Sequence, residues 1–343
     1  MEQSSFISSF ENNGKYKISK AYIISFFLLA AISLTCIECV DRYLIYKKSI
    51  SYKKLRRFNS QLDKVQVIFL GDSHFMAGID EQWFEMKTFN LSFGGTNYIE
   101  SYYILRYYID KMDSLKVVVL PFDLHSFSSF RSDRIINPVF WNQFIDYPEL
   151  VDVKGKGILK NKYSLAMLSL GAGIKPLMQE FINSVTNKMF TAKENNSDKL
   201  EDNSRNYASW DVYRRVEFQF AGSKIIDKDL LDYFERILEM CSEKGVKVVT
   251  LQMPLSSVYI NYAEKYVTQE YLKDHIFKVD DVNALIYKDL NYIDYFSQNR
   301  DMFTADGEHL NAKGREIFKK TIVHDFSEVF TEILAKEESI NNK

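Results

Sequence analysis

Three short apolar runs, rich in β-branched residues, constrain the fold of this chain more than any other feature. They are residues 65–70 (VQVIFL), 115–123 (LKVVVLPFD) and 246–254 (VKVVTLQMP). Continuous apolar runs of this length are typical of strands that are buried on both faces of a parallel sheet. Helical patterns lie between them, at 97–112 and 227–245. This alternation predicts an α/β domain whose parallel sheet is covered by helices on both faces.

The composition of the 343 residues fits a globular domain and excludes some classes of protein. Hydrophobic residues make up 46% of the chain, and the formal net charge is only −2. Because there is no basic excess, we expect no nucleic acid partner. The three cysteines provide neither a disulfide framework nor a zinc quartet. The part of the chain that is expected to fold contains no paired metal-ligand spacing, and the sequence has no phosphate loop with its lysine, so we predict neither a metal nor another cofactor.

An uncharged segment near the N-terminus, Ala21–Ile37, has 17 residues, close to the minimum for a membrane-spanning helix. It lacks a small-residue cleavage site, so we expect an uncleaved transmembrane anchor over 21–40, after a polar tail over 1–20. A buried core helix is the alternative interpretation. The basic residues that follow the segment favour a cytoplasmic C-terminal part, although large domains often translocate regardless of charge. The orientation therefore stays open.

The remaining chain is divided by its composition. We expect a basic linker over 41–64, the α/β domain over 65–335 and a polar tail over 336–343. Residues 150–225 interrupt the alternation of strands and helices and are predicted to form a helical and loop insertion that covers the site. An interfacial contact of this insertion with the membrane is the alternative. A further strand is expected over 292–296 (YIDYF).

The first apolar run leads into Gly71, Asp72, Ser73 and His74. Reacting groups of parallel α/β sheets collect beyond the carboxyl ends of the strands, and Ser73 is predicted to lie at such an end. Gly-Asp-Ser is also ordinary turn chemistry when it stands alone. A serine hydroxyl becomes an effective nucleophile when a base removes its proton and a carboxylate orients that base. The interpretation therefore depends on a matching histidine and acid.

Among the five histidines, His309 follows Asp306 by three residues, on a turn before a charged amphipathic helix. This spacing places the two side chains on the same side of a helical turn. The carboxylate of Asp306 is then able to accept the Nδ1 proton of His309 and to leave Nε2 facing Ser73. We predict that Ser73 is a nucleophile, His309 its general base and Asp306 the orienting acid.

The segments GDSH (71–74), NLSFGG (90–95) and DGEHLN (306–311) resemble the first, second and fifth sequence blocks of the SGNH/GDSL hydrolase superfamily. The resemblance extends in block order over about residues 65–325. It implies a flavodoxin-like α/β/α sandwich that hydrolyses esters or transfers acyl groups. The Ser–His–Asp set of that family falls on the three residues predicted above.

The histidine after the serine and the N-terminal anchor look most like the bacterial branch of that superfamily that acts on surface polysaccharides. That branch includes alginate O-acetylation proteins and a teichoic-acid D-alanylation protein. The resemblance implies a membrane-anchored serine esterase or O-acyltransferase, with acetyl as the expected group, whose α/β domain is extracytoplasmic. Its expected partners are an acylated glycan or acyl donor and a membrane-bound acyltransferase. Two alternatives remain: a catalytically weak glycan-binding subunit of an envelope-modifying complex, and a cytoplasm-facing lipid or thioester hydrolase.

The second block is expected to contribute to an oxyanion hole, because an acyl-transfer transition state needs aimed hydrogen-bond donors. The backbone N–H groups of Ser73 and Gly95 are the predicted donors, with Gly94 as an alternative register. Ser92 replaces the first glycine of the family pattern N-x-G-x-x-G. The neighbouring His74 is expected either to contact the substrate or to be structural.

The third block departs further from the family pattern, G-x-N-D, in which the asparagine side chain is a third donor. Here the strand runs into residues 120–127 (LPFDLHSF), with Asp123 but no asparagine. Either the third donor is missing or Asn97 supplies it. The same segment contains His125, a candidate lining residue of the pocket. Loss of one donor lowers the rate by roughly 10²–10³-fold, which motivates the alternative of a weak binding subunit.

Overall fold

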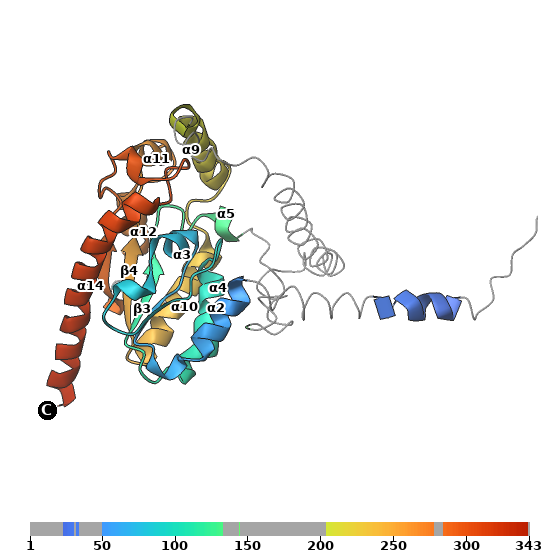
Figure 1. Ribbon diagram of the computed structural model, residues 1–343, viewed down its shortest axis with the longest axis vertical. Helices are drawn as coiled ribbons and strands as arrows, with labels where there is room; N and C mark the ends of the chain where they lie inside the picture. The colour runs from blue at the N-terminus through green and yellow to red at the C-terminus, as the bar shows by residue number, and fades with distance from the viewer. Residues whose placement is uncertain are drawn as a thin grey trace, which may run out of the picture.

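The computed structural model describes part of the chain, and its centre is a parallel sheet (Figure 1). The described residues are 23–30, 32–33, 50–132, 144, 204–277 and 284–341. The sheet has five strands in the order β2-β1-β3-β4-β5, and every neighbouring pair is parallel. The predicted α/β class with a central parallel sheet is therefore confirmed.

The three predicted apolar runs contain the three central strands. The strands are β1 (Val67–Phe69), β2 (Thr88–Asn90), β3 (Val117–Pro121), β4 (Lys247–Gln252) and β5 (Ile286–Asn291). The strand predicted over 292–296 is wrong, because β5 ends at Asn291 and turns follow it. As an edge strand, β5 is only partly buried, so its residues do not form the continuous apolar run that identifies a central strand.

The helices surround this sheet on both faces. They are α2 (Ile50–Asn59), α3 (Ser73–Gly78), α4 (Tyr98–Tyr108), α5 (Ser129–Ser132), α9 (Ser204–Phe220), α10 (Lys228–Glu243), α11 (Ser257–Ala263), α12 (Gln269–Ile276) and α14 (Ala312–Asn341). Short 3₁₀ helices are η3 (Leu62–Lys64), η4 (Glu81–Trp83), η5 (Ile109–Lys111) and η7 (Arg300–Met302).

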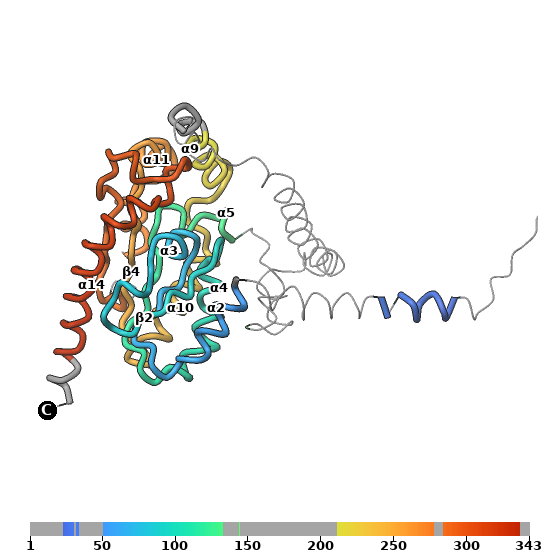
Figure 2. The backbone as a smooth tube through the Cα atoms, viewed as in Figure 1, coloured from blue at the N-terminus to red at the C-terminus, as the bar shows by residue number. Residues whose placement is uncertain are grey.

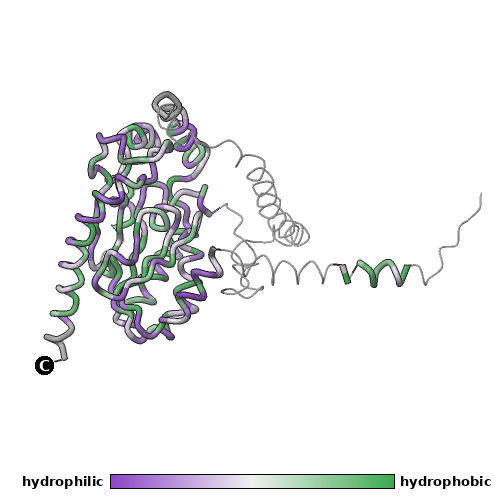
Figure 3. The backbone as a smooth tube through the Cα atoms, viewed as in Figure 1, coloured by the Kyte–Doolittle hydropathy of each residue, from purple (hydrophilic) through white to green (hydrophobic). Residues whose placement is uncertain are grey.

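Two hydrophobic cores follow from the alternation of side chains along each strand. Val67 and Phe69 of β1 face a core that includes Phe318 and Phe326 of α14. Ile68 faces the opposite core, which contains the buried faces of α2, α4 and α10. Figure 1 shows α14 on one side of the sheet and these three helices on the other. Along α14, hydrophobic and hydrophilic residues alternate, as expected of a helix with one buried face (Figure 3).

Helix α2 changes the predicted start of the domain. It occupies residues 50–59 of the segment 41–64 that was predicted to be a linker, and it buries Leu55 and Phe58 in the core. The basic residues made this segment resemble a solvated connection, but they share a helix with these two anchoring side chains. At the other end, α14 continues to Asn341, so the predicted tail over 336–343 begins inside a helix.

Helix α9 belongs to the predicted insertion over 150–225, yet it is part of the core through Val212, Val216 and Phe220. It packs against α11, and the two helices lie together at one end of the molecule (Figure 2). The predicted cover over the site falls on residues 150–203, which lie outside the described residues.

The predicted anchor is described only in part. Residues 23–30 and 32–33 are helical, and large apolar side chains there are exposed. Figure 3 colours this segment as mostly hydrophobic. Within the described part of the chain, none of the helices has both the length and the apolar character needed to cross a bilayer. The rest of the predicted anchor over 21–40, and the tail over 1–20, lie outside the described residues.

Candidate active site

Ser73 lies at the carboxyl end of the sheet, where β1 leads directly into α3. Gly71 lets the chain pass closely beside β3, because a Cβ at this position would lie only 3.0 Å from Cγ of Pro121. Asp72 caps the helix by accepting a 2.9 Å hydrogen bond from the backbone N–H of His74. The Gly-Asp-Ser turn is thus a helix N-terminus that carries a partly exposed serine.

The structure brings Ser73, His309 and Asp306 together. Nε2 of His309 lies 2.9 Å from Oγ of Ser73, although the two residues are 236 positions apart. On the other side of the ring, Nδ1 of His309 lies 2.7 Å from Oδ2 of Asp306. The side chains of His309 and Asp306 are 17% and 32% exposed, so the group remains accessible from solvent.

The carboxylate of Asp306 is held in its ionised form. Burial disfavours the charge, but hydrogen bonds from His309 and Thr304 and the charge of His309 outweigh burial and lower the pKa of Asp306. Its other oxygen, Oδ1, accepts the backbone N–H groups of Glu308 at 3.0 Å and His309 at 3.1 Å. An ionised Asp306 keeps the proton of the ring on Nδ1, which leaves Nε2 free to act as a base.

The turn that carries Asp306 and His309 depends on a glycine. Gly307 has a φ of +69°, which L side chains rarely adopt, and a Cβ there would lie 2.4 Å from Oγ of Ser256. The carbonyl of Gly307 accepts a 3.0 Å hydrogen bond from the backbone N–H of Ser256. This close contact seats the turn against the segment that follows β4.

The predicted oxyanion donors lie on two adjacent segments. The N–H of Phe93 donates a 2.9 Å hydrogen bond to the carbonyl of Gly71 and ties the loop after β2 to the turn before α3. Beyond this bond, Gly94 is exposed and Gly95 is partly buried, with a φ of +84°. Ser73 is the first residue of α3, a position whose N–H has no acceptor within the helix.

Asn97, named above as one alternative for a third donor, caps helix α4 in the structure. Its Oδ1 accepts the N–H of Glu100, its own N–H donates to the Glu100 carboxylate, and together they form a capping box at the start of α4. Its Nδ2 donates to the carbonyl of Arg131 at 2.8 Å. An asparagine followed three residues later by glutamate is the local signature of a helix start.

His74, for which a substrate contact and a structural role were both left open, is buried beneath the site and is 2% exposed. Its Nδ1 lies 2.8 Å from Oδ2 of Asp123, and its Nε2 lies 2.8 Å from Oε1 of Glu308. Burial lowers its pKa, but the nearby charges of Asp123 and Asp72 and the two hydrogen bonds raise it well above the usual value. Each ring nitrogen therefore donates to a carboxylate, and His74 is an internal cation rather than a substrate ligand.

Asp123 lies just after the end of β3. Its Oδ1 accepts the backbone N–H of Met253 at 3.0 Å, and its other oxygen faces His74. The side chain is 1% exposed. At this position the chain thus offers a buried hydrogen-bond acceptor.

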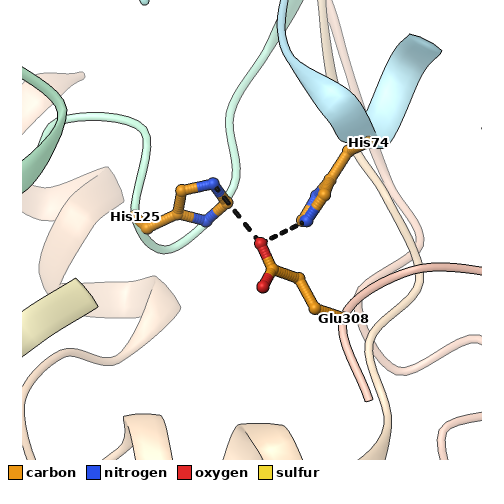
Figure 4. Close-up of side chains that lie close together, drawn as sticks. All are labelled: His74, His125 and Glu308. Atoms are coloured by element: carbon orange, nitrogen blue, oxygen red, sulfur yellow. Dashed lines mark hydrogen bonds and ion pairs between the residues drawn. The ribbon is translucent and has the colours of Figure 1, made fainter. Parts of the chain in front are cut away.

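Glu308, which directly precedes His309, is a further residue of the site that no sequence motif indicated. Its side chain is fully buried, and Figure 4 shows it between His74 and His125. It accepts hydrogen bonds from His74, from Nη2 of Arg215 at 3.1 Å and from Nε2 of Gln219 at 3.0 Å, and Nε of Arg215 donates to its second oxygen. Burial disfavours its charge, but these donors hold the pKa of Glu308 well below the usual range. No local pattern points to such a role, since Arg215 is 93 positions away.

A second ion pair lies beside this one. Nη2 of Arg131, on α5, is 2.7 Å from Oδ2 of Asp72, and Nε2 of His125 is 3.2 Å from the same oxygen. Burial raises the pKa of Asp72, but the charges of Arg131 and His74 outweigh it and lower that pKa well below its usual value. Burial also lowers the pKa of His125, which has no exposed surface. His125, a candidate for lining the pocket, therefore belongs to the buried network instead.

Several of these side chains are close enough together to suggest a metal site. Within the described residues, three groups have potential ligand atoms within 4.8 Å of one another: His74, His125 and Glu308; Asp72, His74 and Asp123; Asp306, Glu308 and His309. A histidine ligand must offer a lone pair, and a carboxylate ligand must be free of competing cations. Here both nitrogens of His74 donate to carboxylates, while Arg131 and Arg215 pair with Asp72 and Glu308. The donor set fits an internal ion-pair network and does not fit a metal.

Comparisons with known proteins give only distant likenesses. No protein-family model and no curated protein matches the chain. Solved structures that are similar to it include one from Streptococcus pneumonia, provisionally described as a platelet activating factor, with 11% identity, a TM-score of 0.35 and coverage of 90% of this chain and 99% of that chain. A provisionally described acylhydrolase from Bacteroides fragilis NCTC 9343 has 11% identity and a TM-score of 0.37, and the match covers 83% of this chain and 99% of that chain. A lipase/acylhydrolase from Enterococcus faecalis has 13% identity and a TM-score of 0.32, and the match covers 76% of this chain and 95% of that chain. Likenesses this distant do not assign an activity to this chain.

Proposed function

We propose that the protein is a serine-dependent acyl-transfer enzyme, either an esterase or an O-acyltransferase of the SGNH type. One observation carries the proposal: the hydroxyl of Ser73 lies 2.9 Å from Nε2 of His309, whose Nδ1 lies 2.7 Å from the carboxylate of Asp306. A nucleophile within hydrogen-bond reach of a base, with that base oriented by a third group, is the arrangement that activates a hydroxyl for attack on a carbonyl.

The proposed reaction has two halves. In the first, His309 removes the proton of Ser73 as Oγ attacks the acyl carbonyl, and the N–H groups of Ser73 and Gly95 stabilise the resulting oxyanion. The tetrahedral intermediate collapses, its ester C–O bond breaks, and His309 gives the proton to the departing alcohol. In the second half, water or a sugar hydroxyl attacks acyl-Ser73, with His309 taking its proton and returning it to Ser73.

The proposed substrate is an acylated cell-envelope polysaccharide or an acyl donor, with acetyl as the group transferred. In this proposal the segment over 21–40 anchors the chain, the α/β domain is extracytoplasmic and a membrane-bound acyltransferase supplies the acyl group. The support is the resemblance of GDSH (71–74) and of the uncharged N-terminal segment to the envelope-acting branch. The orientation is tested by a reporter at the C-terminus, and activity confined to the cytoplasm would favour a lipid or thioester hydrolase.

Labelling of the full chain with a fluorophosphonate probe tests the activity. We expect the wild-type chain and Ser60→Ala to be labelled and Ser73→Ala to be unlabelled. Ser60 is a suitable control because it is exposed and its hydroxyl donates only to the carbonyl of Arg57. A folded wild-type chain that resists the probe would contradict the proposal and favour the catalytically weak glycan-binding subunit.

A second measurement identifies the acceptor. The chain is given a chromogenic acetyl ester with and without an oligosaccharide, and free acetate and acetylated sugar are quantified by mass spectrometry. An esterase releases acetate at the same rate in both mixtures, whereas an O-acyltransferase forms acetylated sugar at the expense of acetate. Both products must disappear in Ser73→Ala if Ser73 carries the acyl group.

A further inference from the structure

The immediate chain neighbours of Ser73 and His309 form a hydrogen bond of their own. His74 follows Ser73, Glu308 precedes His309, and Nε2 of His74 lies 2.8 Å from Oε1 of Glu308. Two hydrogen bonds therefore join the start of α3 to the turn over 306–309. The outer one is the 2.9 Å contact between Ser73 and His309 in the accessible site. The inner one is completely buried.

We propose that Glu308 is a positioning residue for the reaction and that His74 and Arg215 hold it in place. Glu308 touches no substrate in this proposal. It fixes the turn over 306–309 so that Nε2 of His309 stays within reach of Oγ of Ser73. The inference rests on the proposed acyl-transfer function and adds the buried array that sets the geometry of that site.

The inner hydrogen bond joins two ionised groups. His74 is faced by Asp123 and Glu308 at its two nitrogens and by Asp72 at the N-cap of its own helix. The ring of His125 lies edge-on at 5.0 Å, and the ring of His309 lies edge-on at 4.9 Å, both between centroids. Arg131 and Arg215 are the other cations in contact with these carboxylates.

The charges of this array cancel. With His74 charged and His125 neutral, three cations match three carboxylates. The carboxylates are those of Asp72, Asp123 and Glu308, and the cations are His74, Arg131 and Arg215. Removing one member of a buried ion pair leaves its partner uncompensated, which is far more costly than losing a surface pair. The array therefore resists displacement of Glu308 more strongly than a single hydrogen bond would.

Helix α9 supplies the part of the array that can be altered without opening the core. Arg215 is 25% exposed, whereas the side chain of Glu308 has no exposed surface. Gln219, one turn further along α9, donates to Glu308 and accepts from the hydroxyl of Tyr259 on α11. The position of α9 on α11 therefore affects the position of Glu308 and, through it, that of His309. A small misplacement of a reacting group is sufficient to lower a rate by roughly 10²-fold.

The first experiment compares Arg215→Met and Arg215→Lys with Arg236→Met in the full chain, using a chromogenic acetyl ester. Arg236 is a matched control because it is also a helical arginine that pairs with a carboxylate, that of Asp232, but it lies on α10 and is about half exposed. We expect Arg215→Met to lower kcat by about tenfold or more with KM within about twofold, because positioning is lost and not binding. Arg215→Lys is expected to recover part of the loss, and Arg236→Met to match the wild type.

A second variant, Glu308→Gln, tests the inner bond itself, with its melting temperature measured alongside. Gln keeps the shape of the side chain but removes the charge that favours the cationic form of His74. We expect the alkaline limb of the pH profile of kcat/KM to move to lower pH in this variant, because His74 then loses its proton more readily. A loss of fold alone would lower kcat without moving that limb.

Imidazole NMR separates a failure of this inference from a failure of the proposed function. In the wild type, the His74 signals, assigned by their absence in His74→Asn, are expected to stay at the doubly protonated position between about pH 5 and 8, where an ordinary histidine titrates. Arg215→Met is expected to shift the His309 signals. A wild type that is not labelled by fluorophosphonate overturns the acyl-transfer function alone. Ordinary titration of His74, or unchanged His309 signals and kcat in Arg215→Met, overturns the positioning array.

Discussion

Nζ of Lys54, on helix α2, donates a 2.5 Å hydrogen bond to the backbone carbonyl of Ser92. The same ammonium lies 5.0 Å from the centre of the Phe93 ring, so it contacts the loop that continues into Gly94 and Gly95. The helix that precedes β1 in the chain therefore supports the loop that is proposed to bind the oxyanion. This contact gives α2 a place in the site as well as in the fold.

The Lys54 contact predicts a dependence of stability on alkaline pH. Burial lowers the pKa of Lys54 from 10.5 to about 8, with Glu81 opposing this shift and Arg57 adding to it. Between these two pH values the unfolded chain binds more protons than the folded chain, so the free energy of unfolding gains a contribution that rises with pH. Relative to Lys54→Met, which does not titrate, the wild type is expected to become more stable as the pH increases from 8 towards 10.5. Urea unfolding of both proteins across this range checks the sign, and a constant difference would show that Lys54 titrates as an ordinary lysine.

Replacement of Asp306 by asparagine is expected to lower kcat by roughly 10³–10⁴-fold. The amide oxygen of Asn is still able to accept the backbone N–H groups of the turn, but its NH₂ group cannot accept the Nδ1 proton of His309. The ring is then driven into the tautomer with the proton on Nε2, which cannot act as the base for Ser73. Steady-state kinetics and circular dichroism of Asp306→Asn are compared with Asp301→Asn, an exposed carboxylate that pairs with Lys313. Equal activity of the two variants would exclude Asp306 as the orienting group.

A comparison of Gly95→Ala with Gly94→Ala tests the register of the oxyanion loop. Gly95 has a φ of +84°, where an L side chain costs about 1–2 kcal/mol, so alanine is expected to displace its N–H. At Gly94 a Cβ would make an ordinary 3.7 Å contact with the end of the Met76 side chain. We expect kcat/KM with an acetyl ester to fall by about tenfold in Gly95→Ala and to change little in Gly94→Ala. The reverse order would assign the donor to Gly94.

Truncation of Phe58 tests whether α2 is part of the folded domain. Phe58 is completely buried, and its ring lies 4.8 Å from that of Phe89 and 4.9 Å from that of Tyr108, measured between centroids. We expect Phe58→Ala to lower the free energy of unfolding by about 3–5 kcal/mol. Arg56→Ala, on the exposed side of the same helix, is expected to change it by less than about 0.5 kcal/mol. Denaturant unfolding measures both, and a neutral Phe58→Ala would restore the interpretation of this segment as a linker.

The parts of the fold that were predictable are those in which burial leaves a local pattern. The central strands β1, β3 and β4 are buried on both faces, so each appears in the sequence as a continuous apolar run. The edge strand β5 is only partly buried and has charged residues at its centre, and the segment 292–296 that was predicted as a strand forms turns. Helix α2 was hidden because its basic residues dominate the composition, although two side chains anchor it to the core.

The candidate site likewise contains some residues whose roles a local pattern predicts and others whose roles it does not. Asp306 and His309 are three residues apart, so their contact follows from the geometry of a single turn. Asn97 carried a readable signal for helix capping, because Glu100 follows it three residues later. Glu308 carried no local signal, because its partners are 93 and 234 positions away along the chain.

The sequence by itself determined the parallel sheet, the place of Ser73 at a strand end and the pairing of Asp306 with His309, because each depends on residues that are neighbours in the chain. Only the tertiary structure decided that His74 is an internal cation and that Glu308 is held by Arg215. The physical reason is that a buried charge must find its partners in space, and the folded chain brings those partners from segments whose order in the sequence does not reveal their proximity.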